Sequence, residues 1–256
     1  MSAKILKDKL IKGDRVYGTF FQHAVVPAMV DFIPPGALDF VIVTEEHNSL
    51  AMGDFLPVKY ALNAKGIACL VRTHSRDPDD VSKACDAFDG VVVPYVEEVA
   101  HAKALMAAAL YRPLKGRALQ RVLERNEWPS AATKEYVTNV RCKDTVFIPM
   151  IESLAGIENL DAICAIPGVH AVFVGPNDLT TTMGIPNEYD HKDLIANLKK
   201  IIDIADRHHV AAGCWFGKLD QSIRTIRQGA RLVVYSNDSS MLKDAVTSAF
   251  SELKKG

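Results

Sequence analysis

The sequence lacks a long hydrophobic run and lacks an excess of charge of either sign. Its 256 residues contain no apolar stretch near the ~18–20 residues that span a bilayer. The opening segment MSAKILKDKLIKG is broken by lysines and has no apolar centre of the kind found in secretory signals. With 30 basic and 31 acidic residues the net charge is −1. We therefore expect no membrane partner and no nucleic-acid partner.

Cysteine is also scarce, and the common glycine fingerprints are missing. The five cysteines are odd in number, widely spaced and free of CxxC or zinc-ligand spacing. This usage predicts a reducing, cytoplasmic compartment, although one disulfide remains an alternative. Neither GxGxxG nor GxxxxGK[ST] occurs, so the usual dinucleotide and P-loop sites are not indicated.

Short β-branched segments alternate with longer segments of helical spacing along the whole chain. Runs such as VIV, VVV and LVV are apolar without alternation, which is typical of parallel strands buried on both faces. The candidate strands are Val16–Phe21, Leu38–Val43, Ile67–Val71, Gly90–Val96, Thr145–Ile151, His170–Val174, Val210–Trp215 and Arg231–Tyr235.

Helical signals occupy the intervals between these strands. One helix is expected over Val25–Phe32, one beginning at Asp77–Pro78, and one over Ala155–Cys164. The C-terminal segment carries an apolar stripe at a spacing of three and four residues, formed by Leu242, Val246, Ala249, Phe250 and Leu253. Eight strand–helix units in a chain of this length predict an α/β fold, a single (β/α)₈ barrel domain over residues 1–256. An open, doubly wound sheet is the alternative.

Polar side chains follow several of the candidate strands. His47 comes after the second strand, Arg72 after the third, Glu152 after the fifth and Asp178 after the sixth. In such barrels the loops that follow the strands build the active site. Taken singly, each residue could be a helix cap or part of a surface ion pair, but their shared position predicts one polar rim.

Glu152 and Asp178 end consecutive strands, and neighbouring strands lie ~4.8 Å apart. Two carboxylates at that spacing can share a hard cation, and oxygen ligands favour Mg²⁺ or Mn²⁺. The alternatives are that Asp178 caps the following helix and that Glu152 pairs with a lysine. The strands are nearly free of lysine, with Lys218 on a loop as the nearest candidate, so a Schiff-base mechanism is not favoured.

Arg72 and His47 complete the candidate catalytic set. The guanidinium of Arg72 fits a carboxylate or phosphate, and a structural ion pair with Asp86 is compatible with that role. A histidine at the position of His47 can move protons near neutral pH, although a lone histidine is more often structural.

Several segments together resemble the HpcH/HpaI aldolase family of metal-dependent, pyruvate-specific class II aldolases. These are LDFVIVTEEHNS, LVRTHSRDPDDVSKACD, IPMIES and IPGVHAVFVGPNDLTTTMG, the last being the most specific. The resemblance implies a barrel of the phosphoenolpyruvate/pyruvate type with an extra C-terminal helix. It also implies aldol cleavage or condensation of 4-hydroxy-2-oxo acids to pyruvate and an aldehyde, and a homo-oligomer, a hexamer built as a trimer of dimers.

The resemblance further implies a role for each candidate residue. Glu152 and Asp178 would ligate a divalent metal (Mg²⁺ or Mn²⁺, with Co²⁺ as a further candidate). Arg72 would hold the pyruvate oxygens and offset the enolate charge, and His47 would belong to the acid–base apparatus. The pyruvate carboxylate would be bound by backbone N–H groups near Gly175, Pro176, Asn177 and Asp178.

Two positions depart from the family pattern. Thr44 replaces the aspartate that usually orients the imidazole, and Met150 replaces a glutamine two residues before the metal-ligating glutamate. Three alternative functions therefore stay open: oxaloacetate decarboxylation or citrate-lyase-like cleavage through the same enolate, 2-oxo-acid binding without turnover, and a role mainly as an assembly subunit.

Overall fold

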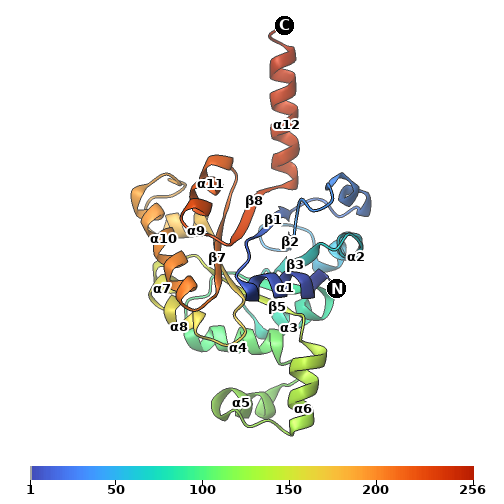
Figure 1. The fold of residues 1–256 in the computed structure, drawn as a ribbon, viewed down its shortest axis with the longest axis vertical. Helices are drawn as coiled ribbons and strands as arrows, with labels where there is room; N and C mark the ends of the chain where they lie inside the picture. The colour runs from blue at the N-terminus through green and yellow to red at the C-terminus, as the bar shows by residue number, and fades with distance from the viewer. Residues whose placement is uncertain (1) are drawn as a thin grey trace.

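The computed structural model describes residues 2–256 as a closed barrel of eight parallel strands in sequence order, with helices around it (Figure 1). The barrel prediction is confirmed, and the open sheet is excluded. Each strand begins and ends within three residues of its predicted bounds. The strands are β1 Val16–Phe21, β2 Phe40–Thr44, β3 Ala68–Arg72, β4 Gly90–Val93, β5 Val146–Ile151, β6 Ala171–Val174, β7 Ala211–Phe216 and β8 Leu232–Asn237.

The uninterrupted apolar runs arise because both faces of every strand are covered. In β2, Phe40 and Ile42 belong to the cluster inside the barrel, whereas Val41 and Val43 belong to the cluster between strands and helices. All four side chains are fully buried. The two clusters therefore hold the strand from both sides, which leaves its C-terminal end to present polar groups.

The helices around the barrel follow the predicted order, with local differences. The segment expected as a helix over Val25–Phe32 is a 3₁₀ helix that starts at Pro27, and the segment Ala155–Cys164 divides into two short helices at Asn159. Asp77 caps its helix as expected, accepting a hydrogen bond from the Asp79 N–H at 2.7 Å. The elements are η1 Pro27–Phe32, η2 Met52–Phe55, α2 Leu56–Ala64, α3 Pro78–Ala87, α4 Val99–Leu110, α7 Leu154–Glu158, α8 Leu160–Cys164, α9 Pro176–Thr182, α10 Lys192–Arg207 and α11 Leu219–Arg227.

The N-terminal segment forms helix α1, Ser2–Lys12, which sequence patterning did not predict. Leu6 and Leu10 on this helix are buried in the cluster that fills the barrel interior. Because α1 precedes β1, it closes the end of the barrel where the strands begin. The opposite end, where the strands finish, is left to form the site.

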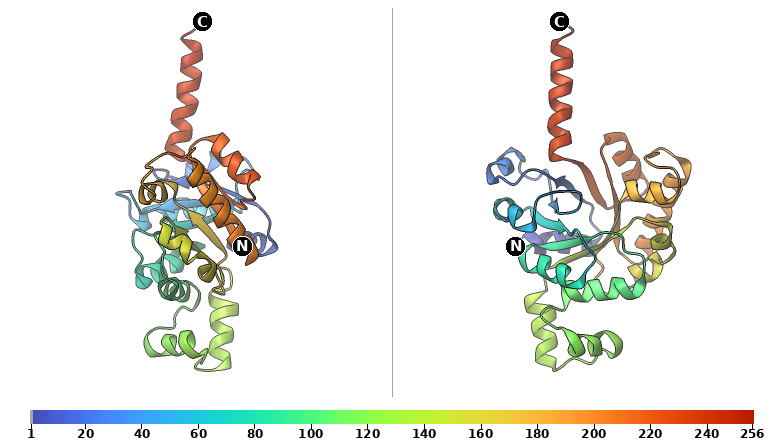
Figure 2. Two further views of the ribbon diagram at one scale, coloured as in Figure 1. Left: turned by 90° about the vertical axis from the view of Figure 1, so that its left-hand side faces the viewer. Right: turned by 180° about the vertical axis from the view of Figure 1, so that it is seen from behind.

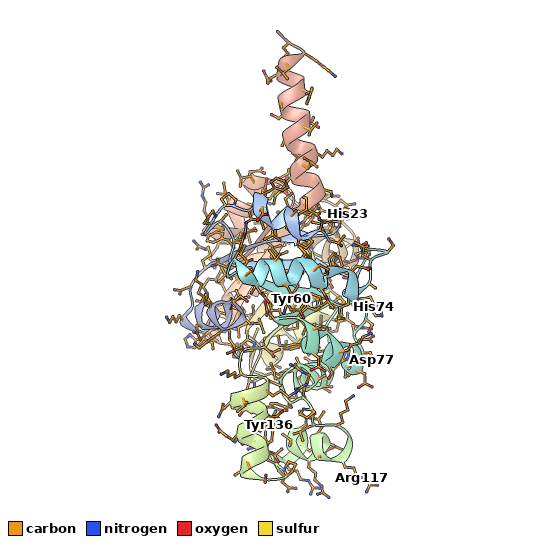
Figure 3. The ribbon with its side chains drawn as sticks, turned by 90° about the vertical axis from the view of Figure 1, so that its right-hand side faces the viewer. His23, Tyr60, His74, Asp77, Arg117 and Tyr136 are labelled. Atoms are coloured by element: carbon orange, nitrogen blue, oxygen red, sulfur yellow. The ribbon has the colours of Figure 1, made fainter. Side chains whose placement is uncertain are left out.

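A lobe built from α5 Gly116–Arg125, α6 Ala131–Glu135 and the π-helix η3 Tyr136–Arg141 extends from the barrel between α4 and β5. Figure 2 shows this lobe and the C-terminal helix projecting at opposite ends of the molecule, and Figure 3 places Arg117 and Tyr136 on it. Val122 and Val137 are the buried residues of its helical segments.

The C-terminal helix α12, Asp238–Leu253, projects away from the barrel (Figures 1 and 2). None of its residues is buried, and Leu242 and Leu253 are 65% and 71% exposed. The predicted apolar stripe thus exists but does not pack on its own barrel. Within residues 2–256, no helix combines the length and the apolar character needed to cross a bilayer.

Candidate active site

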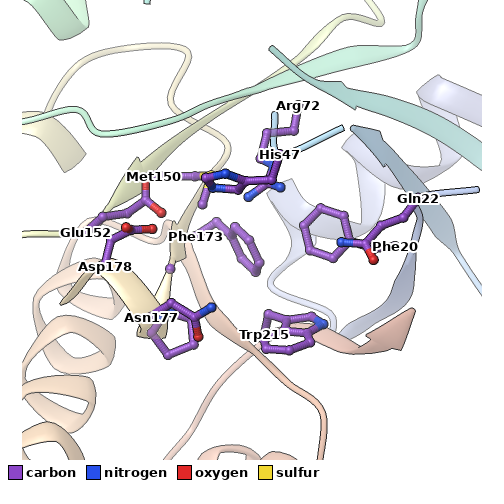
Figure 4. Close-up of a pocket in the computed structure, with 12 residues that line it drawn as sticks. Phe20, Gln22, His47, Arg72, Met150, Glu152, Phe173, Asn177, Asp178 and Trp215 are labelled. Atoms are coloured by element: carbon purple, nitrogen blue, oxygen red, sulfur yellow. The ribbon is translucent and has the colours of Figure 1, made fainter. Parts of the chain in front are cut away.

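A cavity of about 120 Å³ lies at the end of the barrel where the strands finish (Figure 4). The predicted residues His47, Arg72, Glu152 and Asp178 all line it, together with the segment Gly175–Asp178. The structure therefore brings together every predicted site residue except Asp86. The remaining lining residues are Phe20, Gln22, Met150, Phe173 and Trp215.

Glu152 and Asp178 lie next to each other on one side of the cavity (Figure 4). Glu152 follows β5 and is 3% exposed, and its Oε2 accepts a hydrogen bond from the Tyr95 N–H at 2.8 Å. Burial raises the pKa of Glu152 to about 7, and the nearby charges of Glu46 and Asp178 add to the rise. The alternative partner for Glu152, a lysine, is not found among its contacts in residues 2–256.

Gly175 is required by the close approach of Glu152. A Cβ atom at position 175 would lie 1.9 Å from Glu152 Oε1. The backbone there has a φ of −88°, which any residue can adopt, so the constraint is steric. The glycine before Pro176 therefore allows the carboxylates that follow β5 and β6, those of Glu152 and Asp178, to lie close together.

Arg72 ends β3 and is fixed by groups on the neighbouring β2 loop. Its Nε donates to Thr44 Oγ1 at 2.9 Å, its Nη2 donates to the Glu46 carbonyl at 3.3 Å, and its Nη1 lies 3.1 Å from Glu46 Oε2. The guanidinium also stacks over Phe20, with 5.0 Å from Cζ to the ring centroid. These contacts fix the orientation of the planar, positively charged guanidinium of Arg72 in the cavity.

The alternative for Arg72, a structural ion pair with Asp86, is not formed. Asp86 lies near the C-terminus of α3, towards the end of the barrel where the strands begin. Its Oδ1 pairs there with Arg112 Nε at 3.1 Å and Arg141 Nη2 at 2.9 Å. Sequence proximity to Arg72 was misleading because a barrel helix runs back along the strand, so its last turn lies at the opposite end of the barrel from the active site.

Glu46 is a site residue that the sequence reasoning missed. Its Oε1 lies 4.0 Å from His47 Nε2, and its other oxygen pairs with Arg72. Thr44 is not bonded to the imidazole, because its hydroxyl donates to the Glu46 carbonyl at 3.0 Å and accepts from Arg72. The carboxylate nearest to His47 thus comes from within the segment TEEH, and the two adjacent glutamates were the available signal.

Glu45, the other glutamate of that segment, has a structural role. Its Oε1 accepts from the Met52 N–H at 2.8 Å, and its Oε2 lies 3.5 Å from His74 Nδ1. His47 itself adopts a left-handed φ of 57°, and its side chain is 68% exposed at the mouth of the cavity. The loop thus turns Glu46 inward and leaves the imidazole accessible to substrate.

The donor set of the cavity fits a divalent cation. The carboxylates of Glu46 and Asp178 both lie near that of Glu152, and within residues 2–256 Arg72 is the one guanidinium lining the cavity. A hard doubly charged ion would offset this negative charge. Within residues 2–256 no three His, Cys, Asp or Glu side chains form a metal cage. The ion would therefore take Glu152 and Asp178 and keep positions for substrate and water.

Comparison with known proteins identifies the family. The sequence profile of the HpcH/HpaI aldolase/citrate lyase family matches residues 19–245. A hydroxypyruvate/pyruvate aldolase from Chromohalobacter salexigens is 28% identical over 246 residues, which are 95% of each chain. A 5-keto-4-deoxy-D-glucarate aldolase from Escherichia coli O157:H7 is 25% identical over 230 residues, covering 90% of this chain and 89% of the relative.

Solved structures show the same fold. An HpcH/HpaI aldolase from Desulfitobacterium hafniense superposes with a TM-score of 0.83 at 24% identity, covering 98% of this chain and 97% of that chain. A family protein from Burkholderia cenocepacia also gives 0.83, at 23% identity and with 98% and 99% covered. The aldolase resemblance seen in the sequence is thus confirmed, and the chain belongs to the HpcH/HpaI aldolase/citrate lyase family.

Proposed function

We propose that this lyase cleaves the C3–C4 bond of 4-hydroxy-2-oxo acids to give pyruvate and an aldehyde, and that it catalyses the reverse condensation. The reaction depends on Mg²⁺ or Mn²⁺. The observation that carries the proposal is the convergence of Glu152, Asp178, Arg72 and His47 on one cavity. A divalent cation between the two carboxylates would polarise the ketone of the 2-oxo acid.

The residues of the chain supply the rest of the chemistry. In the cleavage direction the C4 hydroxyl loses its proton, the C3–C4 bond breaks, and its electron pair passes to the 2-oxo group as an enolate. The guanidinium of Arg72 offsets the enolate charge. The N–H groups of Asn177 and Asp178 lie in the first turn of α9, without intrahelical acceptors, and would bind the carboxylate.

We assign the proton transfers of this reaction to His47. The imidazole lies at the accessible mouth of the cavity, beside Glu46, whose carboxylate would stabilise the protonated ring. It would accept the C4 hydroxyl proton during cleavage, and the enolate carbon then takes up a proton to give pyruvate. In the condensation direction the same proton transfers run in reverse.

The direct test is pyruvate release from 4-hydroxy-2-oxo acids, with oxaloacetate and citryl-CoA assayed in parallel. We expect pyruvate from the 4-hydroxy-2-oxo acid with Mg²⁺ or Mn²⁺ present, loss of activity after exhaustive chelation, and recovery when the cation is returned. Activity that survives chelation would contradict the proposed role of Glu152 and Asp178. Faster turnover of oxaloacetate or of citryl-CoA would favour the alternative lyase reactions.

We also infer that α12 packs against a second copy of the chain. Its apolar stripe is exposed, with Val246 at 49% and Phe250 at 56%. Exposed apolar residues also occur on η1, α11 and the outward face of β1. These are Met29, Phe32, Leu219, Ile223 and Tyr17. Exchange of α12 between protomers would bury its apolar stripe together with exposed apolar residues of the partner.

Sedimentation velocity tests this exchange. The full chain is expected to sediment as an oligomer, and a chain lacking residues 239–256 as a smaller species. Phe250→Asp should act like the deletion because it places a charge in the apolar stripe, whereas Ser248→Asp on the opposite face of α12 should not. An unchanged oligomer after the deletion would refute the exchange.

The five cysteines, all buried and unpaired, are compatible with the reducing cytoplasm that we propose for this protein.

A further inference from the structure

The cavity has a second half that the pyruvate chemistry does not use. Arg72, His47, the two carboxylates and the Gly175–Pro176 segment are assigned to the pyruvate chemistry. The lining side chains that remain are those of Phe20, Gln22, Met150, Phe173, Asn177 and Trp215. Figure 4 shows Gln22 and Phe20 across the cavity from Glu152 and Asp178. This half is where the aldehyde would be held, so the inference below rests on the proposed function.

This half of the cavity has no arginine or lysine, among residues 2–256, that is free to receive a charged aldehyde. Among residues 2–256, the lining contains one arginine and no lysine, and Arg72 is already bonded to Thr44 and Glu46. Even with a divalent cation and Arg72 in place, the carboxylates of Glu46, Glu152, Asp178 and pyruvate leave a net negative charge, to which an additional carboxylate would add. Like charges within such a site repel one another strongly, so the pocket disfavours an aldehyde acid.

Asn177 presents an oriented amide at the edge of the cavity. Its Oδ1 accepts the phenol proton of Tyr189, which is shared with Asn187 Oδ1 at 2.9 Å. With the oxygen occupied, the two amide protons are the groups that Asn177 can offer to a ligand. Burial raises the pKa of the Tyr189 phenol, so this group remains a donor at neutral pH.

Tyr189 is itself fixed by the neighbouring elements. Its carbonyl accepts a hydrogen bond from Arg224 Nη2 at 2.8 Å, and its ring packs edge-on against Phe216 at 6.1 Å between centroids. Arg224 also pairs with Asp190 at 2.7 Å. Tyr189 is therefore a positioning residue, held by α11 and β7, that sets the direction of the Asn177 amide.

Gln22, across the cavity from Glu152 and Asp178, lies on a loop whose backbone is held by hydrogen bonds. Its N–H donates to both carboxylate oxygens of Asp238 at 3.2 Å, and its carbonyl accepts from Asn48 Nδ2. Trp215 has its indole N–H bonded to the Ser236 carbonyl at 2.9 Å, so it offers the substrate an apolar ring rather than a donor. The subsite thus combines two amides with aromatic surfaces.

From this arrangement we propose that the aldehyde is a short, uncharged hydroxyaldehyde whose hydroxyl binds the amide of Asn177. In the condensation, the pyruvate methyl carbon loses a proton and bonds to the aldehyde carbon, and the aldehyde oxygen gains a proton to become the C4 hydroxyl. A cavity of about 120 Å³ leaves room for an aldehyde of few carbon atoms beside pyruvate.

Three aldehydes that differ mainly in one group test the proposal: glycolaldehyde, propanal and glyoxylate. We expect kcat/KM for glycolaldehyde to exceed that for propanal by about tenfold, the effect of one hydrogen bond, and to exceed that for glyoxylate by more. Tyr189→Phe should raise KM for glycolaldehyde about tenfold and change KM for propanal less than twofold. The matched control Tyr60→Phe, an exposed tyrosine on α2, should change neither.

A measurement without aldehyde separates this inference from the proposed function. Exchange of the pyruvate methyl protons in D₂O, followed by NMR with Mn²⁺ removed before recording, requires the enolate chemistry alone. Absence of exchange would overturn the proposed function and the inference with it. Exchange accompanied by equal or better use of propanal or glyoxylate would overturn the inference alone, as would a Tyr189→Phe variant with an unchanged KM for glycolaldehyde.

Discussion

Replacing Glu152 with glutamine is expected to lower kcat by about 10³-fold or more. A neutral amide binds a divalent cation weakly, and Lewis-acid stabilisation of the transition state is worth several kcal/mol. The measurement is pyruvate release at saturating Mn²⁺. Glu158→Gln, which changes an exposed glutamate six residues further along the chain, is the matched control and should retain activity.

The stability of the Glu152→Gln variant distinguishes a functional carboxylate from a structural one. The folded pKa of Glu152, about 7, lies above the ordinary value of 4.5, so the native state holds its proton more tightly than the unfolded state. The stability of the cation-free protein should therefore fall as the pH rises from 4.5 to 7. Glutamine removes this loss, so above pH 7 without cation the variant should unfold at the same or a higher temperature. A lower melting temperature would indicate a structural role.

Replacing Arg72 with lysine is expected to lower kcat by about 10²- to 10³-fold, the range observed when one oxyanion donor is removed. Lysine keeps the charge but loses the planar group that bonds Thr44 and Glu46 and stacks on Phe20. Steady-state kinetics with pyruvate and an aldehyde measure the change.

Arg207→Lys is the matched control for this substitution, because Arg207 forms an exposed ion pair with Asp161. It should leave kcat within twofold of the unsubstituted protein. The assigned role predicts that Arg72→Lys lowers kcat more than it raises KM for pyruvate, since the enolate carries more charge than the bound ketone. A change confined to KM would show that Arg72 only binds the ground state.

The barrel was predictable from the sequence because its signal is local. An apolar, β-branched strand such as Phe40–Thr44 must be covered on both faces, and eight such strands alternating with helices leave few arrangements. The helix α1 was not predicted, because Leu6 and Leu10 are the only large apolar residues on its buried face, among four lysines. The projection of α12 could not be predicted either, since an apolar stripe fits a partner as well as the chain's own barrel.

The site was predictable to the extent that strand order determines it. Glu152 directly follows β5, and Asp178 lies in the first turn of the helix after the adjacent strand β6. Their proximity therefore follows from topology, and the Gly175 beside them removes the steric obstacle. The pairing of Arg72 with Glu46 rather than Asp86 was not predictable, because it depends on how the loop after β2 turns at His47. The positions of Gln22 and Tyr189 likewise depend on loop conformations set by distant residues.

The claim on which this account depends is that Glu152 and Asp178 bind one divalent cation together with a 2-oxo acid. Crystals soaked with Mn²⁺ and pyruvate, recorded at a wavelength where manganese scatters anomalously, test it directly. The account predicts a single anomalous peak between the two carboxylates, with pyruvate density in contact with it and with Arg72. No peak at that position, or a peak elsewhere with pyruvate bound apart from Glu152, would contradict it.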